Sequence, residues 1–379
     1  ILNPGSETLD HRLSAQACGQ CHSYQSQSQA QKIDWNKNGP RFLPGQNLKP
    51  RVAVVHASNF IADKNPGTPA ELKAFVATHK HLPFGRGDLL DRFWPDGMVR
   101  VTGREYNGLL DTPCFQRGKM SCLSCHSMHG YHDKNDQLAP RMETNDACLQ
   151  CHDDLRENLT AHTHHAANSA GSLCYNCHMP HTTYGLLNSI RSHQIDSPSV
   201  EMQLKTGRPN ACNLCHLDQA LDWTSQRLAK WYGHRQPPLD NDDKTISSTL
   251  KLLLKGDAGQ RAIAAWHMGW EPARNASGGA WQAPWLLRAM GDPYAAVRYI
   301  AHKALMADLK FADTPFDYTA SSDKRTDQVA NALGQWRERQ EHGQAVRPEL
   351  LLDATGQPLD NAADKLARQR DNRPMTLQE

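Results

Sequence analysis

The stretch CLSCHSMHG, residues 122–130, places two cysteines and two histidines in one short segment. Its first five letters form a Cys-x-x-Cys-His motif, and this motif occurs five times between residues 18 and 216. The ten motif cysteines are Cys18, Cys21, Cys122, Cys125, Cys148, Cys151, Cys174, Cys177, Cys212 and Cys215. The five motif histidines are His22, His126, His152, His178 and His216. Repetition of this motif is typical of covalent attachment of c-type haem.

The spacing within the motif suits haem attachment for a chemical reason. Two thiols one helical turn apart can bond to the two vinyl groups on one porphyrin edge, and the following histidine can then reach the iron. Structural zinc held by paired cysteines does not require a histidine after every second cysteine. A disulfide framework rarely repeats one short motif five times. We therefore predict five covalently bound haems c, with the iron of each held by the motif histidine.

The composition limits the class of protein. The chain has 379 residues, of which 39% are hydrophobic, and a formal net charge of +2. Its mean hydropathy is −0.68, and no run of about 18 apolar residues occurs, so we expect a soluble protein with no membrane span. The near-neutral charge, without a basic stripe, indicates that nucleic acid is not a partner. The first residues lack signal-peptide features, so we expect a signal outside this chain and, because haem c is attached after export, a periplasmic or cell-surface location.

The spacing of the motifs predicts the fold class. The last four motifs lie too close together for a conventional core, so we expect a mainly α, loop-rich domain, residues 1–216, organised around five stacked haems. After His216 cysteine disappears, and amphipathic patterns predict an all-α domain over residues 217–345. The expected helices cover residues 217–233, 244–256, 258–270, 280–291 and 292–309. The polar segment 346–379 predicts an extended charged tail with one helix near residues 360–370.

The long interval between the first two motifs carries weaker signals. Turn residues surround a helix expected near residues 70–80, and FWPDGMVRVTGREYNGLL, residues 93–110, predicts a short hairpin. Cys114 belongs to no motif. We interpret it as a small buried apolar residue beside a haem, with a functional thiol as the alternative.

The second axial ligand of each iron decides what the haems can do. Subtracting the five motif histidines from the total of 20 leaves 15, so bis-histidine ligation with low potentials is the simplest expectation. His129 lies too close to His126 in sequence to bind the same iron, and we expect it to ligate a neighbouring haem. The other candidates before the fifth motif are His56, His79, His81, His162, His164, His165 and His193. His267 and His302 lie on apolar helical faces, where a histidine is more often a core residue.

Two segments resemble a known group of proteins. SLCYNCHMPHTTYGLLNSIRSHQIDSPS, residues 172–199, and TGRPNACNLCH, residues 206–216, resemble the multihaem cytochromes c of the pentahaem nitrite reductase, octahaem hydroxylamine oxidoreductase and cytochrome c-554 group. Residues 93–110 and 207–223 resemble more closely exported pentahaem cytochromes with C-terminal helical repeats of TPR or HEAT type. The resemblance covers roughly residues 15–310. Its motifs are specific for haem binding and for architecture, but they do not specify a reaction.

The resemblance also implies distal ligands. They are His129 for the first motif, His193 for the second and His56 for the third. A histidine of the C-terminal helices is implied for the fourth motif, and His164 or His165 for the fifth. The nitrite reductases attach their catalytic haem through Cys-x-x-Cys-Lys, and no such motif occurs in this sequence. The catalytic haem of that group is therefore not recognisable.

Three functions compete on this evidence. The leading expectation is an electron carrier in which closely spaced haems form a conducting chain toward redox partner proteins or sibling subunits. The alternative is a reductase of nitrite or hydroxylamine at one five-coordinate haem, with proton donors from residues 103–108 and 191–194. A third possibility is a subunit of an extracellular conductive filament. Low-spin iron throughout would favour the carrier or the filament, and a high-spin signal would favour the enzyme.

Overall fold

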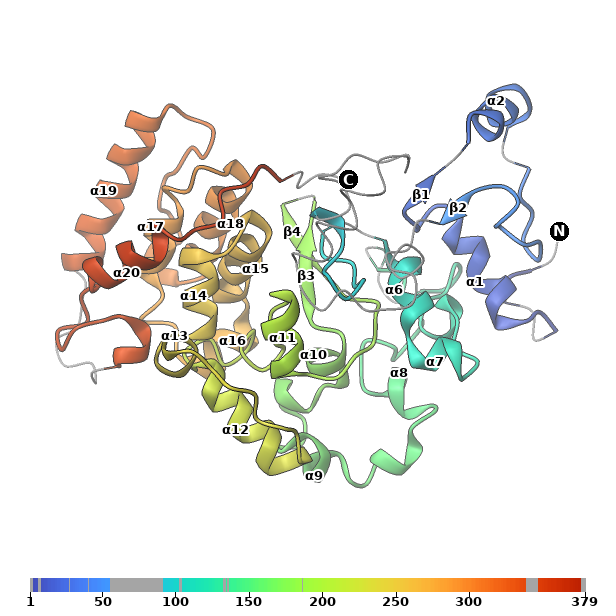
Figure 1. Cartoon of the computed structure of the whole chain (residues 1–379), viewed down its shortest axis with the longest axis horizontal. Helices are drawn as coiled ribbons and strands as arrows, with labels where there is room; N and C mark the ends of the chain where they lie inside the picture. Colours follow the sequence, from blue (N-terminus) through green and yellow to red (C-terminus); the bar gives the residue numbers. More distant parts are fainter. Residues whose placement is uncertain are drawn as a thin grey trace. The chain divides into compact units, whose positions relative to one another are not determined.

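The computed structural model of the chain divides into two compact units. It describes residues 3–5, 8–26, 28–39, 41–54, 91–101, 104–131, 134, 136–185, 187–338 and 347–375. Unit 1 comprises Ile1–His181 and Arg191–Ser197, and unit 2 comprises Thr182–Ile190 and Pro198–Glu379. The described part is mainly helical, with two small two-stranded sheets, as the sequence predicts for the fold class (Figure 1).

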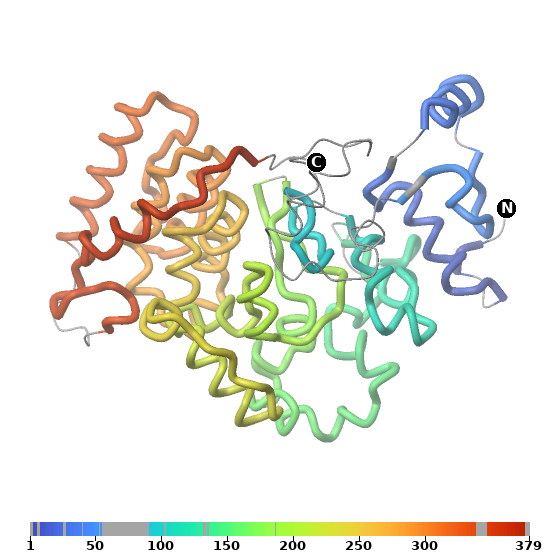
Figure 2. The backbone as a smooth tube through the Cα atoms, viewed as in Figure 1, coloured from blue at the N-terminus to red at the C-terminus, as the bar shows by residue number. Residues whose placement is uncertain are grey.

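Unit 1 is built from short elements joined by loops, which Figure 2 traces as brief coils along the chain. Its elements are α1 (His11–Gly19), β1 (Gln25–Ser26), α2 (Gln29–Asn38), β2 (Ala53–Val54), α6 (Glu105–Asp111), α7 (Pro113–Gln116), η1 (Cys122–Ser124), α8 (Asp146–Leu149), η2 (Asp153–Leu155), α9 (Leu159–Thr163), η3 (Ala170–Ser172) and α10 (Cys174–His178). Strands β1 and β2 are antiparallel. Of the hairpin expected over residues 93–110, the structure has a tight turn with one bridge, Phe93 to Val99, whereas the end of that range forms helix α6. The helix expected near residues 70–80 lies outside the described residues.

The apolar core of the described part of unit 1 includes two small clusters and further buried side chains. One joins α1 to α6 and α7 through Ala15, Tyr106, Leu109 and Phe115, with Cys122 packed against it. Another contains Phe42, Leu48 and Val52. Phe93, Trp94, Met98, Val99 and Val101 are also buried in this unit. Burial of apolar surface is the main stabilising contribution in folding, so these groups stabilise the short elements of unit 1.

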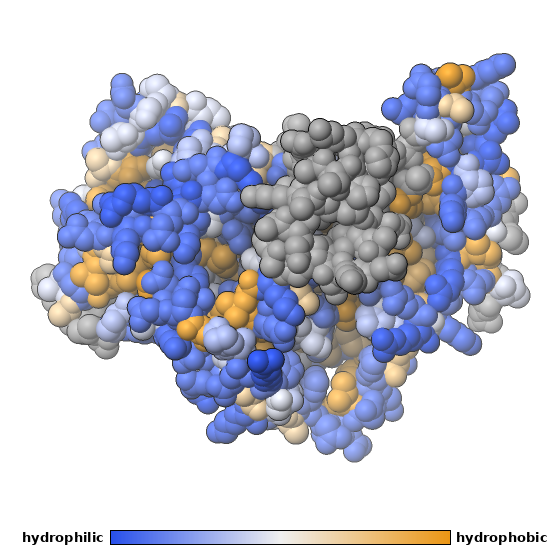
Figure 3. Space-filling view, viewed as in Figure 1, coloured by the Kyte–Doolittle hydropathy of each residue, from blue (hydrophilic) through white to orange (hydrophobic). Residues whose placement is uncertain are grey.

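Unit 2 is a helical body with a large continuous core. Its elements are α11 (Val200–Thr206), α12 (Leu221–Tyr232), α13 (Asn241–Thr245), α14 (Ser248–Lys255), α15 (Ala258–Gly269), α16 (Glu271–Ser277), α17 (Ala283–Ala289), α18 (Ala295–Leu305), η4 (Leu309–Phe311), α19 (Ser322–Glu338), η5 (Pro348–Leu350) and α20 (Asp360–Ala367). Helices α12, α14, α15, α17 and α18 fall within the five expected ranges. Helix α15 packs against α14 and α18, and fully buried Trp285, Met268 and Leu305 contribute to the core between the helices. On the face shown in Figure 3, hydrophilic side chains cover most of this unit, with apolar patches between them.

A second small sheet connects the fourth motif to the segment that carries His193. Strands β3 (His181–Tyr184) and β4 (Asn188–Arg191) pair with each other, and the residues between His181 and Arg191 belong to unit 2. Thr183 donates a hydrogen bond to the Gly259 carbonyl (2.9 Å), and the Trp266 indole donates to Asn188 (2.9 Å). These bonds fasten the sheet to α15. No helix among the described residues is long and apolar enough to cross a membrane.

The predicted boundary after residue 216 differs from the division that the structure shows. The fifth motif lies in unit 2, because the side chain of Asn213 accepts from Thr224 (2.8 Å) and its carbonyl accepts from Thr249 (2.5 Å). These two threonines lie on α12 and α14. The fifth motif is therefore held by the helices that follow it, an interaction between distant residues that the motif spacing does not encode.

The expected extended tail is wrong for residues 347–375. Leu350, Leu351 and Leu352 are buried in the main core of unit 2, as are Ala363 and Leu366 of α20. Helix α20 itself agrees with the helix expected near residues 360–370. The charged composition of the segment conceals a leucine run and an amphipathic helix, and these bury enough apolar surface to order it.

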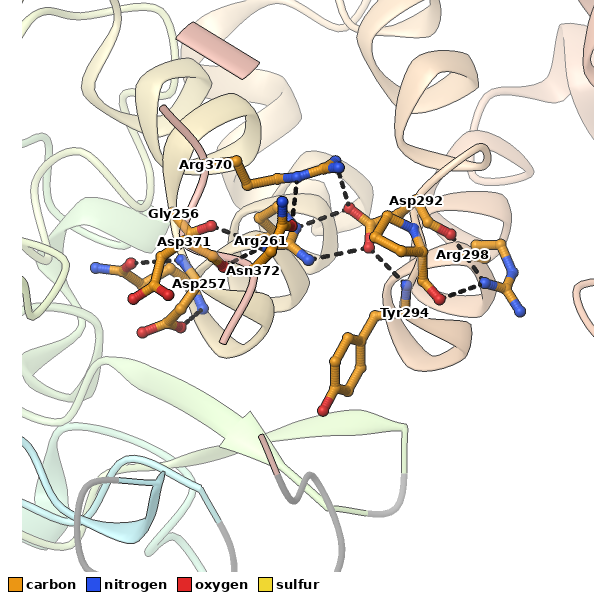
Figure 4. A network of polar contacts seen from close by, with 11 residues as sticks. Gly256, Asp257, Arg261, Asp292, Tyr294, Arg298, Arg370, Asp371 and Asn372 are labelled. Carbon is orange, nitrogen blue, oxygen red and sulfur yellow. Dashed lines mark hydrogen bonds and ion pairs between the residues drawn. The ribbon is translucent and has the colours of Figure 1, made fainter. Parts of the chain in front are cut away.

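Buried ion pairs join this C-terminal segment to the helices of unit 2 (Figure 4). The Arg261 guanidinium donates to both carboxylate oxygens of Asp292, at 2.7 and 3.0 Å, and both side chains are almost fully buried. Arg261 also donates to the Gly256 and Asp371 carbonyls, at 2.7 and 3.3 Å. Arg370 lies 3.5 Å from Asp292. Asp292 is thus a shared acceptor for α15 and for the segment after α20.

Candidate haem-binding site

All five Cys-x-x-Cys-His motifs adopt one conformation, a single helical turn. The backbone N–H of the histidine donates to the carbonyl of the first cysteine at 2.9 Å in the first and second motifs, 3.0 Å in the third and 2.8 Å in the fifth. The fourth motif is itself the helix α10. In such a turn, side chains three and four positions apart lie on the same face. Each motif therefore presents its two thiols and its imidazole on one side, as attachment to one porphyrin requires.

Three motif histidines are oriented by a hydrogen bond at Nδ1. In His126 the acceptor is the Asp136 carbonyl (2.8 Å), and in His178 it is the Asp196 carbonyl (2.9 Å). His22 differs, because its Nδ1 lies 3.0 Å from the Glu105 carboxylate. With the proton on Nδ1, Nε2 is the nitrogen that can bind a metal, and such second bonds orient metal-binding histidines generally.

Two motif histidines each have the ring of a second histidine nearby. The rings of His126 and His193 have centroids 6.3 Å apart and planes 19° apart. The rings of His178 and His162 are 6.2 Å and 11° apart. Two imidazoles that bind one metal ion from opposite sides, through bonds of about 2 Å, have centroids roughly 6 Å apart. Both pairs have the separation and the near-parallel planes that suit the two axial positions of one iron.

The partner histidines also have the local environment of ligands. Nδ1 of His193 bonds to the Arg191 carbonyl (3.1 Å), so Nε2 is again the nitrogen on the other side of the ring. Burial lowers the pKa of His193 and of His162, although the nearby Glu105 carboxylate opposes this shift at His193. A low pKa keeps imidazole neutral near pH 7, which is the form that binds a metal.

Thiols of different motifs are neighbours in unit 1. Interaction with Cys122 lowers the pKa of Cys18 to about 7, while the same interaction, together with burial, raises the pKa of Cys122. Interaction with Cys148 likewise lowers the pKa of Cys174 to about 7, and the pKa of Cys148 is raised. These contacts link the first motif to the second and the third motif to the fourth.

The second and third motifs are also close to each other. Burial raises the pKa of Cys125, and the negative charge of Cys151 raises it further. Burial raises the pKa of Cys114 as well, with a smaller contribution from Cys151. The four motifs of unit 1 thus follow one another in space in their sequence order, and Cys114 lies beside the middle two.

Comparison with known proteins agrees with this geometry. A family described as "Doubled CXXCH motif" matches residues 114–157, which contain the second and third motifs. The matched region is that of a multihaem c-type cytochrome. No curated protein and no solved structure matches the chain.

The remaining ligand candidates of this cytochrome region lie in varied surroundings. His129 is exposed, and its carbonyl accepts from Ser127. His164 is exposed at the end of α9, with a left-handed backbone (φ 56°). His165 is oriented by its own Nδ1 bond to the Thr163 carbonyl (2.6 Å). His56, His79 and His81 lie outside the described residues.

Two histidines of unit 2 have surroundings typical of the core. His267 is 1% exposed, its Nδ1 bonds to the Ile263 carbonyl (2.9 Å), and its ring packs against Trp266 and Trp270. In His302 it is Nε2 that bonds to a carbonyl, that of Thr314 (2.7 Å). A ring that uses Nε2 in this way does not present it to an iron, so His302 fits the core role.

His162 is among the candidates before the fifth motif, but neither the sequence nor the resemblance favours it as a ligand. It stands in the cluster HTHH with His164 and His165, and the resemblance favours the other two. Only the phase of α9 distinguishes them, because His162 lies in its last turn while His164 follows in the left-handed position. A prediction of a helix over residues 159–163 would have distinguished His162 from His164.

The residues present fit covalent haem c. Each motif offers two thiols and a histidine on one face, and the rings of His126 and His178 each lie about 6 Å from a second, nearly parallel imidazole. Haem c supplies one-electron Fe(III)/Fe(II) chemistry when bound. The motif histidines would hold the iron, and the acceptors at Nδ1 would set the basicity of these imidazoles.

Proposed function

We propose that this protein is an electron-transfer cytochrome that carries five haems c, with bis-histidine ligation at the second and fourth motifs. The observation that carries the proposal is the pair of opposed imidazoles, His126 with His193 and His178 with His162. An iron that binds two imidazoles has no open position for a substrate, so it exchanges electrons only. The resemblance independently implies His193 at the second motif, whereas His162 takes the place of the expected C-terminal histidine at the fourth.

The order of the motifs in unit 1 supports a conducting chain. Cys18 neighbours Cys122, and Cys148 neighbours Cys174. Cys125 and Cys151 connect these two pairs. Porphyrins attached at neighbouring thiols are themselves neighbours, so we infer that electrons pass through the first four haems in sequence order.

The setting of this function is inferred from the chemistry of the cofactor. Haem c is attached after export, so we propose a periplasmic or cell-surface location. The partners are other redox proteins or sibling subunits, including assembly into a filament. The near-neutral formal charge of +2 offers no reason for a strongly charged partner.

The first prediction concerns the number of haems. The mature protein should carry five covalent haem additions in its intact mass, because all five motifs share the turn that places both thiols and the histidine on one face. A Cys212→Ser/Cys215→Ser variant should lose one haem and keep the other four. Four or fewer haems in fully matured unaltered protein would contradict the proposal.

A second prediction separates the carrier from a reductase. Purified protein supplied with a reduced viologen dye should not turn over nitrite or hydroxylamine, because the bis-histidine ligation expected for all five haems would close every iron to both. The rate of dye oxidation is the measurement, and an established nitrite reductase in the same assay is the positive control. Steady turnover at about one per second or faster would refute the carrier function.

A further inference from the structure

The acceptors at Nδ1 of the motif histidines are not equivalent. His126 and His178 donate to neutral backbone carbonyls, those of Asp136 and Asp196. Only His22, among the three, donates to a carboxylate, that of Glu105, at 3.0 Å. A hydrogen bond to an ionised acceptor is about twice as strong as one between neutral groups. The first motif therefore has a more electron-rich histidine than the second and fourth.

We propose that Glu105 is a potential-setting residue, which holds the haem of Cys18 and Cys21 at a lower reduction potential than the haem of Cys122 and Cys125. This inference rests on the proposed function, in that His22 is taken as an iron ligand. Negative charge at Nδ1 raises the basicity of the imidazole and stabilises Fe(III) relative to Fe(II). Electrons at equilibrium would then reside on the second haem in preference to the first.

Glu105 is held in place by the packing of α6 against the first motif. It is the first residue of α6, and the N–H of Tyr106 donates to the His22 carbonyl (3.0 Å). Gly19 lies against the Tyr106 ring so closely that a Cβ there would meet the ring at 2.8 Å. The Asn107 side chain accepts from the Tyr24 N–H (2.7 Å). The carboxylate is thus positioned by contacts on both sides of His22.

The exposure of the two side chains agrees with this role. The Glu105 side chain is 22% exposed, while that of His22 is 63% exposed. Partial burial strengthens an electrostatic interaction because less water screens it. The ring of His22 keeps an open face, whereas its Nδ1 edge is occupied by the carboxylate.

The same helix also positions the distal histidine of the second haem. Thr112 donates from its hydroxyl to the His193 carbonyl (3.0 Å) and accepts from the Ile195 N–H (3.1 Å). Gly108 touches the same loop, since a Cβ there would lie 2.8 Å from the His193 carbonyl carbon. Glu105 makes its hydrogen bond to His22, and it reaches His193 only through space. The first haem therefore receives both the hydrogen bond and the charge of Glu105, whereas the second receives only the charge.

Replacement of Glu105 with Gln tests the proposal, because Gln keeps the shape and an acceptor oxygen but removes the charge. The midpoint potential of one haem should rise by at least about 59 mV, a tenfold change in its one-electron equilibrium. Spectroelectrochemical titration of the holoprotein is the measurement. Glu105→Asp retains the charge and should give a smaller rise. Glu143→Gln, which removes an exposed carboxylate from the same unit, should leave every potential within a fraction of that shift.

If E105Q does not attach its haems, a second measurement on the unaltered holoprotein still tests the proposal. With ¹³C-labelled glutamate carboxylates, the infrared difference spectrum between oxidised and reduced protein should contain a labelled band that E105D lacks. Absence of that band, or unchanged potentials in E105Q that retains its haem on the Cys18–Cys21 peptide, would overturn the inference alone. Absence of haem from that peptide in the unaltered protein would overturn the proposed function at this motif as well.

Discussion

Replacement of His193 with Ala is expected to convert one haem from low-spin to high-spin and to raise its midpoint potential, while the other haems keep their spectra. The reason is the geometry of the pair, since the His193 ring lies 6.3 Å from that of His126 with nearly parallel planes. Loss of one strong-field imidazole leaves the iron with an open or water-bound position. Electron paramagnetic resonance of the ferric protein, with integrated high-spin and low-spin signals, is the measurement.

Two controls sharpen this experiment. Added imidazole should restore the low-spin signal, because it can enter the space that the side chain left. His302→Ala should leave the spectrum unchanged, since Nε2 of His302 bonds to a backbone carbonyl. His162→Ala should convert a different haem, so the double variant should show two high-spin irons. An unchanged signal in His193→Ala would remove His193 from the ligand set.

Asp292→Asn is expected to lower the free energy of unfolding of unit 2 by about 3–5 kcal/mol, the usual effect of removing one partner of a buried ion pair. The Arg261 and Asp292 side chains are only 1% and 3% exposed. The substitution leaves the guanidinium buried without its counter-charge, although its bonds to the Gly256 and Asp371 carbonyls remain. Urea denaturation of the holoprotein, followed by circular dichroism of the helices, is the measurement.

The matched control for this variant is Asp364→Asn. Asp364 forms an ion pair with Arg288 in the same unit, but the two side chains are 49% and 33% exposed. Exposed pairs are screened by water, so the midpoint should move much less. Equal shifts in the two variants would show that burial of the Asp292 pair does not contribute the expected stability.

Amphipathic periodicity was sufficient to predict the helices of unit 2, because such a pattern lies within a single segment of the sequence. Helices α14 and α15 follow the capping residues Ser247 and Asp257, whose side chains accept from the backbone of the first turn. Long-range contacts were not predictable in the same way. The placement of Leu350 in the main core, and of Asn213 against α12 and α14, depends on residues far apart in the sequence.

The same distinction between local and long-range information applies to the candidate site. The five motifs could be read directly, because the chemistry requires a fixed local spacing. The identity of the second histidine at each iron depends on which loop returns to which motif, and no periodicity encodes that. His162 and His164 are two residues apart, yet one lies opposite His178 and the other is exposed in a left-handed turn.

The contacts between thiols of different motifs have a consequence for biosynthesis. Before the porphyrins are attached, contact of Cys18 with Cys122 and of Cys174 with Cys148 gives one thiol of each pair a pKa near 7, so about half of it is reactive thiolate at neutral pH. In an oxidising compartment such neighbours would be joined by thiol–disulfide exchange. Closure of the chain before attachment would therefore favour disulfides between the first and second motifs and between the third and fourth. Such disulfides must be reduced before these sulfurs can bond to a porphyrin.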